Sequence, residues 1–125
     1  MGIIFAISFA DSPDWEDNPG AYEFTATMTA VVLINNEQMG DIGDDMLAAF
    51  DDAGNIRGIA LQLDVPENFP SDYAGTILYE MHVRSNSAGD PLNFQYYDAS
   101  DDKIYDIVET YEFVINDILG DVIDP

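Results

Sequence analysis

Arg57 is one of three Lys and Arg residues in a chain that carries 25 Asp and Glu residues. It lies in a short apolar segment, soon after a turn that contains Asp52. An isolated charge inside a protein is very costly, so a guanidinium on an apolar face needs carboxylate or carbonyl oxygens around it. We predict a structural ion pair between Arg57 and Asp52. Acids of the Asp11–Gly20 loop and of the Asp98–Asp102 corner are further partners, and contact with a ligand is the alternative role.

Acid clusters on three loops raise the question of calcium, which takes about six to eight oxygen ligands, often from loop carboxylates. Asp41, Asp44 and Asp45 share one of these loops and are the candidate metal ligands. None of the clusters follows the Asp-x-Asp-x-Asp-Gly spacing of the common calcium loop. In so acidic a chain a solvated cluster is the competing explanation, and calcium is the one cofactor that the sequence leaves open.

Trp15 is the candidate ligand contact among the aromatic residues. It lies in the acidic loop Asp11–Gly20, and a loop tryptophan either covers the core or contacts a partner. An exposed indole stacks well on a sugar ring, so a glycan is the candidate ligand.

The sequence contains little that supports catalysis. His82 is the single histidine, and it alternates with Glu80 and Arg84 on a predicted outward face. One histidine without any cysteine cannot build the usual zinc centres, and the Gly-x-Ser-x-Gly motif of many hydrolases is absent. With 25 acids, a pair of carboxylates is always available and discriminates nothing. We therefore do not expect an enzyme.

The net charge of -22 restricts the partners of this protein. Nucleic-acid binding depends on cations that neutralise phosphates, and an anionic membrane repels an acidic surface, so neither partner is expected. Solubility alone needs a net charge of only about 2–8. Salt at ~1 M shortens the screening length to ~3 Å and removes most of the self-repulsion. The composition therefore favours a salty environment and a marine or halophilic host.

The apolar run Gly2–Ala10 is far shorter than the ~20 residues of a transmembrane helix. It has no Lys or Arg before it, so it is also a poor secretion signal. Its residues Ile3–Phe9 are nonetheless too apolar for a free tail. We expect the arm Met1–Ala10 either to join its own sheet or to add as a strand to another subunit, which would make the protein oligomeric or lattice-bound.

The rest of the sequence alternates between strand patterns and turn patterns. Apolar and polar residues alternate along Tyr22–Met28 and along Ile77–Arg84 with the period of a half-buried strand. Turn residues divide the chain into about seven or eight such segments. We predict an antiparallel β-sandwich over residues 15–125, preceded by an N-terminal strand or arm and a loop over residues 1–14.

The segment around Arg57 has two local interpretations. Asp45–Asp51 and Ile56–Val65 form a predicted hairpin, with Gly54 placed in the turn for a positive φ. A helix over Asp44–Phe50 is the rival, because methionine, leucine and alanine favour helix.

Several short motifs follow one another in a recognisable order: Trp15, Tyr22–Phe24, Ala48–Phe50, Arg57–Gly58, Val83–Ser87, Tyr97–Ser100 and Ile118–Gly120. In this order they resemble a domain of marine bacterial surface proteins and of phage structural proteins. The resemblance covers residues 15–125 and implies a β-sandwich module for display or adhesion, with no catalytic residues to transfer. Met1–Ala10 has no counterpart in it.

These observations lead to two functional hypotheses. The first is a non-enzymatic structural module of a virion, a capsid decoration or tail-associated protein that docks on other virion proteins. It draws on the resemblance, on the salt-adapted surface and on a chain without an export signal. The second is a secreted carbohydrate-binding or adhesion module, extracellular or on the cell surface, in which Trp15 would contact the glycan.

Overall fold

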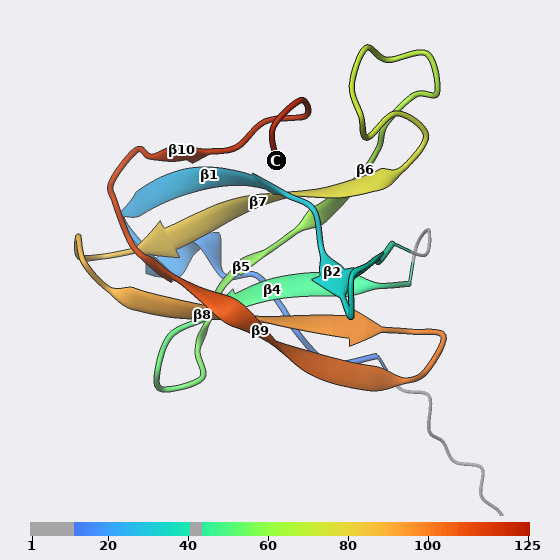
Figure 1. Ribbon diagram of the computed structural model, residues 1–125. Coiled ribbons are helices and arrows are strands. Elements are labelled where there is room, and N and C mark those ends of the chain that lie inside the picture. Colours follow the sequence, from blue (N-terminus) through green and yellow to red (C-terminus); the bar gives the residue numbers. More distant parts are fainter. Residues whose placement is uncertain (1–11, 41–43) are drawn as a thin grey trace, which may run out of the picture.

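The computed structural model describes residues 12–40 and 44–125, and in it two four-stranded β-sheets face each other (Figure 1). The first sheet has the order β10-β1-β7-β6, formed by Ile118–Leu119, Phe24–Ala30, Ile77–Ser85 and Leu61–Asp64. The second sheet has the order β5-β4-β8-β9, formed by Ile56–Ile59, Met46–Phe50, Pro91–Asp98 and Lys103–Glu112. The remaining described elements are the ribbon of β2 (Leu33–Ile34) with β3 (Glu37–Gln38) and a 3-10 turn, η1, at Pro19–Ala21.

The predicted all-β sandwich is confirmed, with differences in detail. The described part of the chain contains ten strands instead of seven or eight, because three of them are only two residues long. The pairing between β1 and β10 is parallel, whereas the other pairs are antiparallel. No helix within residues 12–40 and 44–125 is long and apolar enough to cross a membrane. The arm Met1–Ala10 lies outside the described residues, so both interpretations of it stay predictions.

The rival helix over Asp44–Phe50 is wrong. Met46–Phe50 forms β4, which pairs with β5 on one side and β8 on the other, and four of its five residues are buried. Burial between two neighbouring strands outweighs the intrinsic helix preference of these side chains, which amounts to less than about 1 kcal/mol per residue.

The core lies between the two sheets and follows the alternation of the sequence. Tyr79, Met81 and Val83 of β7 are buried, while Glu80 and His82 between them face solvent. Burying each large apolar side chain contributes about 1.5–3 kcal/mol, so this alternation fixes which face of the strand turns inward. The core positions contributed by β8 are Leu92, Phe94 and Tyr96.

The polypeptide itself closes one side of the sandwich. An almost continuous extended segment passes from β5 in the second sheet to β6 in the first, and at the junction the Ala60 N–H donates to the Leu47 carbonyl at 2.9 Å. Gly58 lies just before this corner, where β5 approaches β7. A Cβ atom at Gly58 would overlap the carbonyl oxygen of His82, so no larger residue fits without displacing a backbone.

A chain of hydrogen bonds crosses the core from one sheet to the other. The hydroxyl oxygens of Tyr79 and Tyr96 are 2.7 Å apart, and Tyr96 donates to a carboxylate oxygen of Asp45 at 2.5 Å. Because Tyr96 has a single hydroxyl proton, it accepts from Tyr79, whose hydroxyl in turn accepts from the Gln62 amide at 3.2 Å. Burial first, and then these bonds, raise the pKa of Tyr96, so it stays protonated at neutral pH. These bonds help to fix how the sheets face each other.

Candidate functional site

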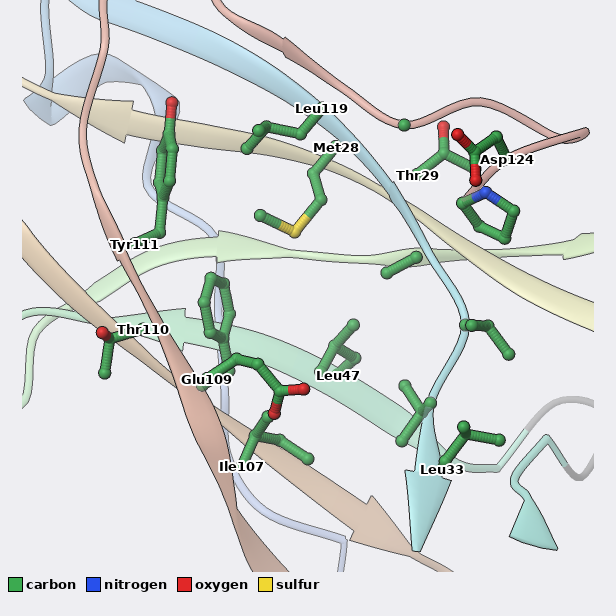
Figure 2. Close-up of a pocket in the computed structure, with 16 residues that line it drawn as sticks. Met28, Thr29, Leu33, Leu47, Ile107, Glu109, Thr110, Tyr111, Leu119 and Asp124 are labelled. Carbon is green, nitrogen blue, oxygen red and sulfur yellow. The ribbon is translucent and has the colours of Figure 1, made fainter. Parts of the chain in front are cut away.

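A groove opens between the two sheets on the side opposite the corner between β5 and β6. Its volume is about 650 Å³, within the range of ~300–1,000 Å³ that is typical of ligand pockets. Figure 2 shows Met28 of β1 and Leu119 of β10 on one wall, facing Leu47 of β4 and Ile107 of β9 on the other. Tyr111 of β9 also lines the groove. The lining is therefore largely apolar and continuous with the core.

The wall of the groove is shaped by a bulge in β9. Between two stretches of regular pairing with β8, the three residues Ile107–Glu109 stand opposite Phe94 alone. A bulge bends its strand and leaves residues outside the ladder. Within this bulge Val108 is 92% exposed, whereas the neighbouring Ile107 lines the groove. Because the bulge adds two residues, the alternation is kept, and Ile107, Glu109 and Tyr111 all line the groove.

The rim of the groove carries the polar groups. Glu109 and Thr110 of β9 and, on the opposite side, Asp124 are exposed at the rim, while Thr29 of β1 is buried in the wall (Figure 2). Two of these four residues are acids, in a protein whose net charge is already -22. The rim therefore suits a neutral or cationic occupant and disfavours an anionic one.

Tyr111 is fixed in place by its hydroxyl. The hydroxyl donates to a carboxylate oxygen of Asp117 at 2.9 Å and accepts from the Val114 N–H at 3.2 Å. Burial raises the pKa of Tyr111, and the bond to Asp117 acts in the same direction against the opposing effect of Val114. The ring is thus a preformed wall of the groove, with its polar atom already bonded within the fold.

Arg57 forms ion pairs, but Asp52 is not among its partners, and this part of the sequence prediction is wrong. The Nε atom of Arg57 donates to Asp51 at 3.0 Å, and Nη1 donates to Asp90 at 3.1 Å. Nη1 also donates to the backbone carbonyl of Arg84 at 3.2 Å. The guanidinium therefore joins the β4–β5 hairpin to the end of β7 and to the turn before β8.

A second bulge explains this choice of partners. Ile56 and Gly58 of β5 pair with successive residues of β4, which leaves Arg57 between them outside the regular ladder. Asp52 is exposed in the turn, whereas the Asp51 side chain is 13% exposed and lies beside the guanidinium. The predicted register assumed unbroken pairing around the turn, and the bulge invalidates it.

The surroundings hold the Arg57 side chain as a largely buried cation, 12% exposed, with Cζ 4.4 Å from the ring centroid of Tyr22. Burial lowers the pKa of Arg57, but its bonds to Asp90 and Asp51 outweigh that effect and the pKa is raised. The Ser85 hydroxyl lowers the pKa of Asp90 most; burial opposes it, and Arg57 lowers the pKa further. Burial alone would raise the pKa of Asp51, but hydrogen bonds from the turn and from Arg57 lower it. These contacts assign Arg57 a structural role.

Trp15 contacts the sheet. Its ring meets that of Phe50 edge to face, with centroids 5.4 Å apart and an angle of 74° between the planes. The chain around Trp15 lies against β4 of the second sheet, and two residues later it reaches the first sheet, where Arg84 of β7 donates to both carboxylate oxygens of Asp17 at 2.5 and 2.7 Å. Trp15 is half-buried. The contact with Phe50 favours the covering role of Trp15 over sugar stacking.

The candidate calcium ligands do not converge in the described residues. Asp45 is 5% exposed, and its two carboxylate oxygens accept from the Ala99 N–H at 2.9 Å and from Tyr96. Asp44 is exposed, and Asp41 lies outside the described residues. Within residues 12–40 and 44–125, no group of three or more acids and histidines is placed to hold a metal ion. Asp45 therefore serves the core, and a calcium site that includes Asp41 stays a prediction.

The three Lys and Arg residues are all engaged within the fold. Arg57 and Arg84 form the ion pairs described above, and Lys103 lies 5.0 Å from the ring centroid of Tyr105. His82 is exposed on β7. Most of the 25 acids consequently have no basic side chain to offset them, and ions from the solvent must do so.

Sequence reasoning missed the groove. Its wall residues Met28 and Tyr111 were assigned to strands of the sandwich, and nothing in their alternation separates a filled core from an open one. One signal was present in the sequence: the apolar residues Val31–Leu33 follow the alternating segment with no polar residue among them. In the structure they lie beyond the end of β1 and line the groove.

Comparisons with known proteins found no relative. No protein-family model, no curated protein and no solved structure matches the chain. The resemblance to marine surface and phage domains therefore stays a hypothesis, and the functional argument depends on the geometry of the molecule.

Proposed function

We propose that this protein is a non-enzymatic structural module of a virion, a capsid decoration or tail-associated protein from a marine or halophilic host. The observation that carries the proposal is an apolar groove on a molecule with a strongly acidic composition. A virion module works by docking repeatedly on neighbouring copies or on other virion proteins. An apolar groove beside the edge strand β9 suits such contacts, because edges and apolar patches are where other chains attach.

The distribution of perturbed side chains supports a structural role. Active sites typically gather groups with shifted pKa values around a cleft that faces the substrate. Here Asp51 and Asp90 each accept a hydrogen bond from Arg57 beside the β4–β5 turn, and the Tyr96 hydroxyl is bonded within the core. Tyr111 also has a shifted pKa and does line the groove, but its hydroxyl already donates to Asp117 and accepts from the Val114 N–H.

Copurification with particles tests the proposal. Virus particles from the source culture are separated on a density gradient in the salt of the growth medium, and their proteins are quantified by mass spectrometry. We expect this protein at a fixed ratio to the major capsid protein across the particle peak, with release only when particles are dismantled. Its presence in the cell envelope or culture medium, with none in the particles, would contradict the proposal.

A secreted carbohydrate-binding or adhesion module is the second candidate, favoured by a groove of ligand size. A glycan array, followed by polysaccharide columns, tests it directly. Retention lost on Trp15→Ala would place the glycan on the outer face of the second sheet. Retention that survives this change and is lost on Leu119→Glu would place it in the groove. Absence of retention on every glycan would reject this candidate.

A further inference from the structure

The groove is elongated along two strands. On one wall it follows the six residues Met28–Leu33, which at ~3.4 Å per residue extend about 17 Å. The other wall is formed largely by Ile107–Tyr111 of β9. Alternate side chains of an extended segment are ~6.8 Å apart, so a groove of this length accommodates about three of them on one face.

One segment of the chain has the matching pattern. Four of the five large apolar residues of Ile3–Phe9 fall at alternate positions, and of the residues between them Ala6 and Ser8 are small, whereas Ile4 is large. The segment contains no acid, although the chain has 25, so it is compatible with the carboxylates of Glu109 and Asp124 at the rim. The alternating large side chains are Ile3, Phe5, Ile7 and Phe9.

We propose that Ile3–Phe9 of a second copy lies in the groove as an extended strand between β1 and β9, so that copies join through their N-terminal arms. This rests on the proposed docking function and deepens it by naming the occupant of the groove. Main-chain bonds to an open sheet edge would supply affinity, and the alternating apolar side chains would set the register.

The path of the chain favours a second copy over the same copy. Trp15 holds the chain against Phe50 on the outer face of the second sheet, and Asp17 then joins it to Arg84 of β7 in the first sheet. The groove lies on the inner side of the second sheet. Only two residues lie between Phe9 and Ser12, and the three steps from Cα to Cα span at most ~11 Å, which is about the spacing between two packed sheets. That length leaves little for passing around β9, whereas an arm from a neighbouring molecule has no such restriction.

Sedimentation velocity on the full chain in molar salt tests the proposal, with one charge placed in the arm or in the groove. We expect the unmodified protein to be oligomeric, and Phe5→Glu and Leu119→Glu each to weaken association by about 30-fold or more. Each has a matched control on the opposite side of its strand. Ser8→Glu lies in the arm among the small residues, and Ile118→Glu changes a residue that is 76% exposed beside Leu119. Both controls should associate normally.

Mixing the two disrupted variants identifies which copy supplies the arm. Phe5→Glu retains an intact groove, and Leu119→Glu retains an intact arm. If arms are exchanged between copies, an equimolar mixture recovers association that neither variant shows alone. If each arm folds into its own groove, mixing recovers nothing, and the proposal is wrong.

Two further results would overturn the inference. One is a full chain that stays monomeric at every concentration, and the other is association that is unaffected by both Phe5→Glu and Leu119→Glu. Circular dichroism confirms that each variant is folded. Should Leu119→Glu unfold the protein, Ile107→Glu with the control Val108→Glu makes the same comparison on β9. Failure here leaves copurification with particles unchanged, so the two proposals fail separately.

Discussion

Replacing Arg57 by alanine removes a cation that joins three segments of the fold. Asp51 and Asp90 accept from the same guanidinium at 3.0 and 3.1 Å, and without it their two carboxylates face each other unneutralised. The backbone carbonyl of Arg84 also loses a donor at 3.2 Å. We therefore expect Arg57→Ala to destabilise the protein while the overall fold is retained.

The size of the effect follows from the burial of the three side chains. Removing one partner of a buried ion pair costs ~3–5 kcal/mol. The side chains of Arg57 and Asp51 are 12% and 13% exposed, but that of Asp90 is 32% exposed, so water replaces part of the lost interaction there. We expect the lower end of the range, about 3 kcal/mol, which lowers Tm by about 12 °C in a domain of this size. Arg57→Lys keeps the charge but loses the planar fork, and should cost about half as much.

Thermal melts followed by circular dichroism, together with urea unfolding at constant m, measure the change. Asp52→Ala is the matched control, because Asp52 is the exposed neighbour that the sequence suggested as the partner, and its loss should stay within ~0.5 kcal/mol. A cost for Arg57→Ala below about 1 kcal/mol, or an equal cost for Asp52→Ala, would refute the reasoning.

Four further predictions concern the whole fold. Gly58→Ala should cost about 2–3 kcal/mol in urea unfolding, because its Cβ meets a backbone oxygen, whereas Gly20→Ala, which has open space around it, should be neutral. Because the pKa of Tyr96 is raised, its contribution to stability is complete below pH ~10 and falls by ~1.4 kcal/mol per pH unit above it. Tyr96→Phe should remove this loss of unfolding free energy at alkaline pH, and it should cost about 2 kcal/mol at neutral pH. Because the pKa values of Asp51 and Asp90 are lowered, their contribution to stability is present above pH ~4 and is lost as the pH falls through the lowered values. A series of melts on acidification should show this loss, and Arg57→Ala should make it smaller but leave the part due to Asn55 and Ser85. Tm should rise steeply between low and molar salt, and a flat response would contradict the halophile argument.

The alternation of side chains was enough to predict the class of fold and much of the core. Tyr79, Met81 and Val83 were assigned to one inward face and lie there, because a one-residue slip would expose all of them. The partners of Arg57 could not be predicted, since a bulge changes the register locally and leaves no mark in the periodicity.

Contacts between distant segments were equally out of reach of the sequence. Asp45 was proposed as a metal ligand, and its role as the acceptor for Tyr96 depends on a packing of sheets that no local pattern records. The same holds for the short parallel pairing of β10 with β1, which joins residues about 90 positions apart and helps to form one wall of the groove.

The corner at Ala60 makes the two long sides of the molecule mechanically unequal. Along that side the chain runs directly from β5 into β6 and so joins the two sheets covalently. The sheets can separate there only if the chain bends close to Gly58, which packs tightly against β7. Along the other side, β10 holds β1 through two residues and β9 is interrupted by its bulge. The two sheets are therefore joined along one edge and free along the other. Backbone amides of β9 and β10 lie at the free edge, whereas those of β4 and β7 lie near the joined edge, so local opening should expose the amides of β9 and β10 first. An occupant of the groove would contact both sheets at this free edge and would suppress its local opening.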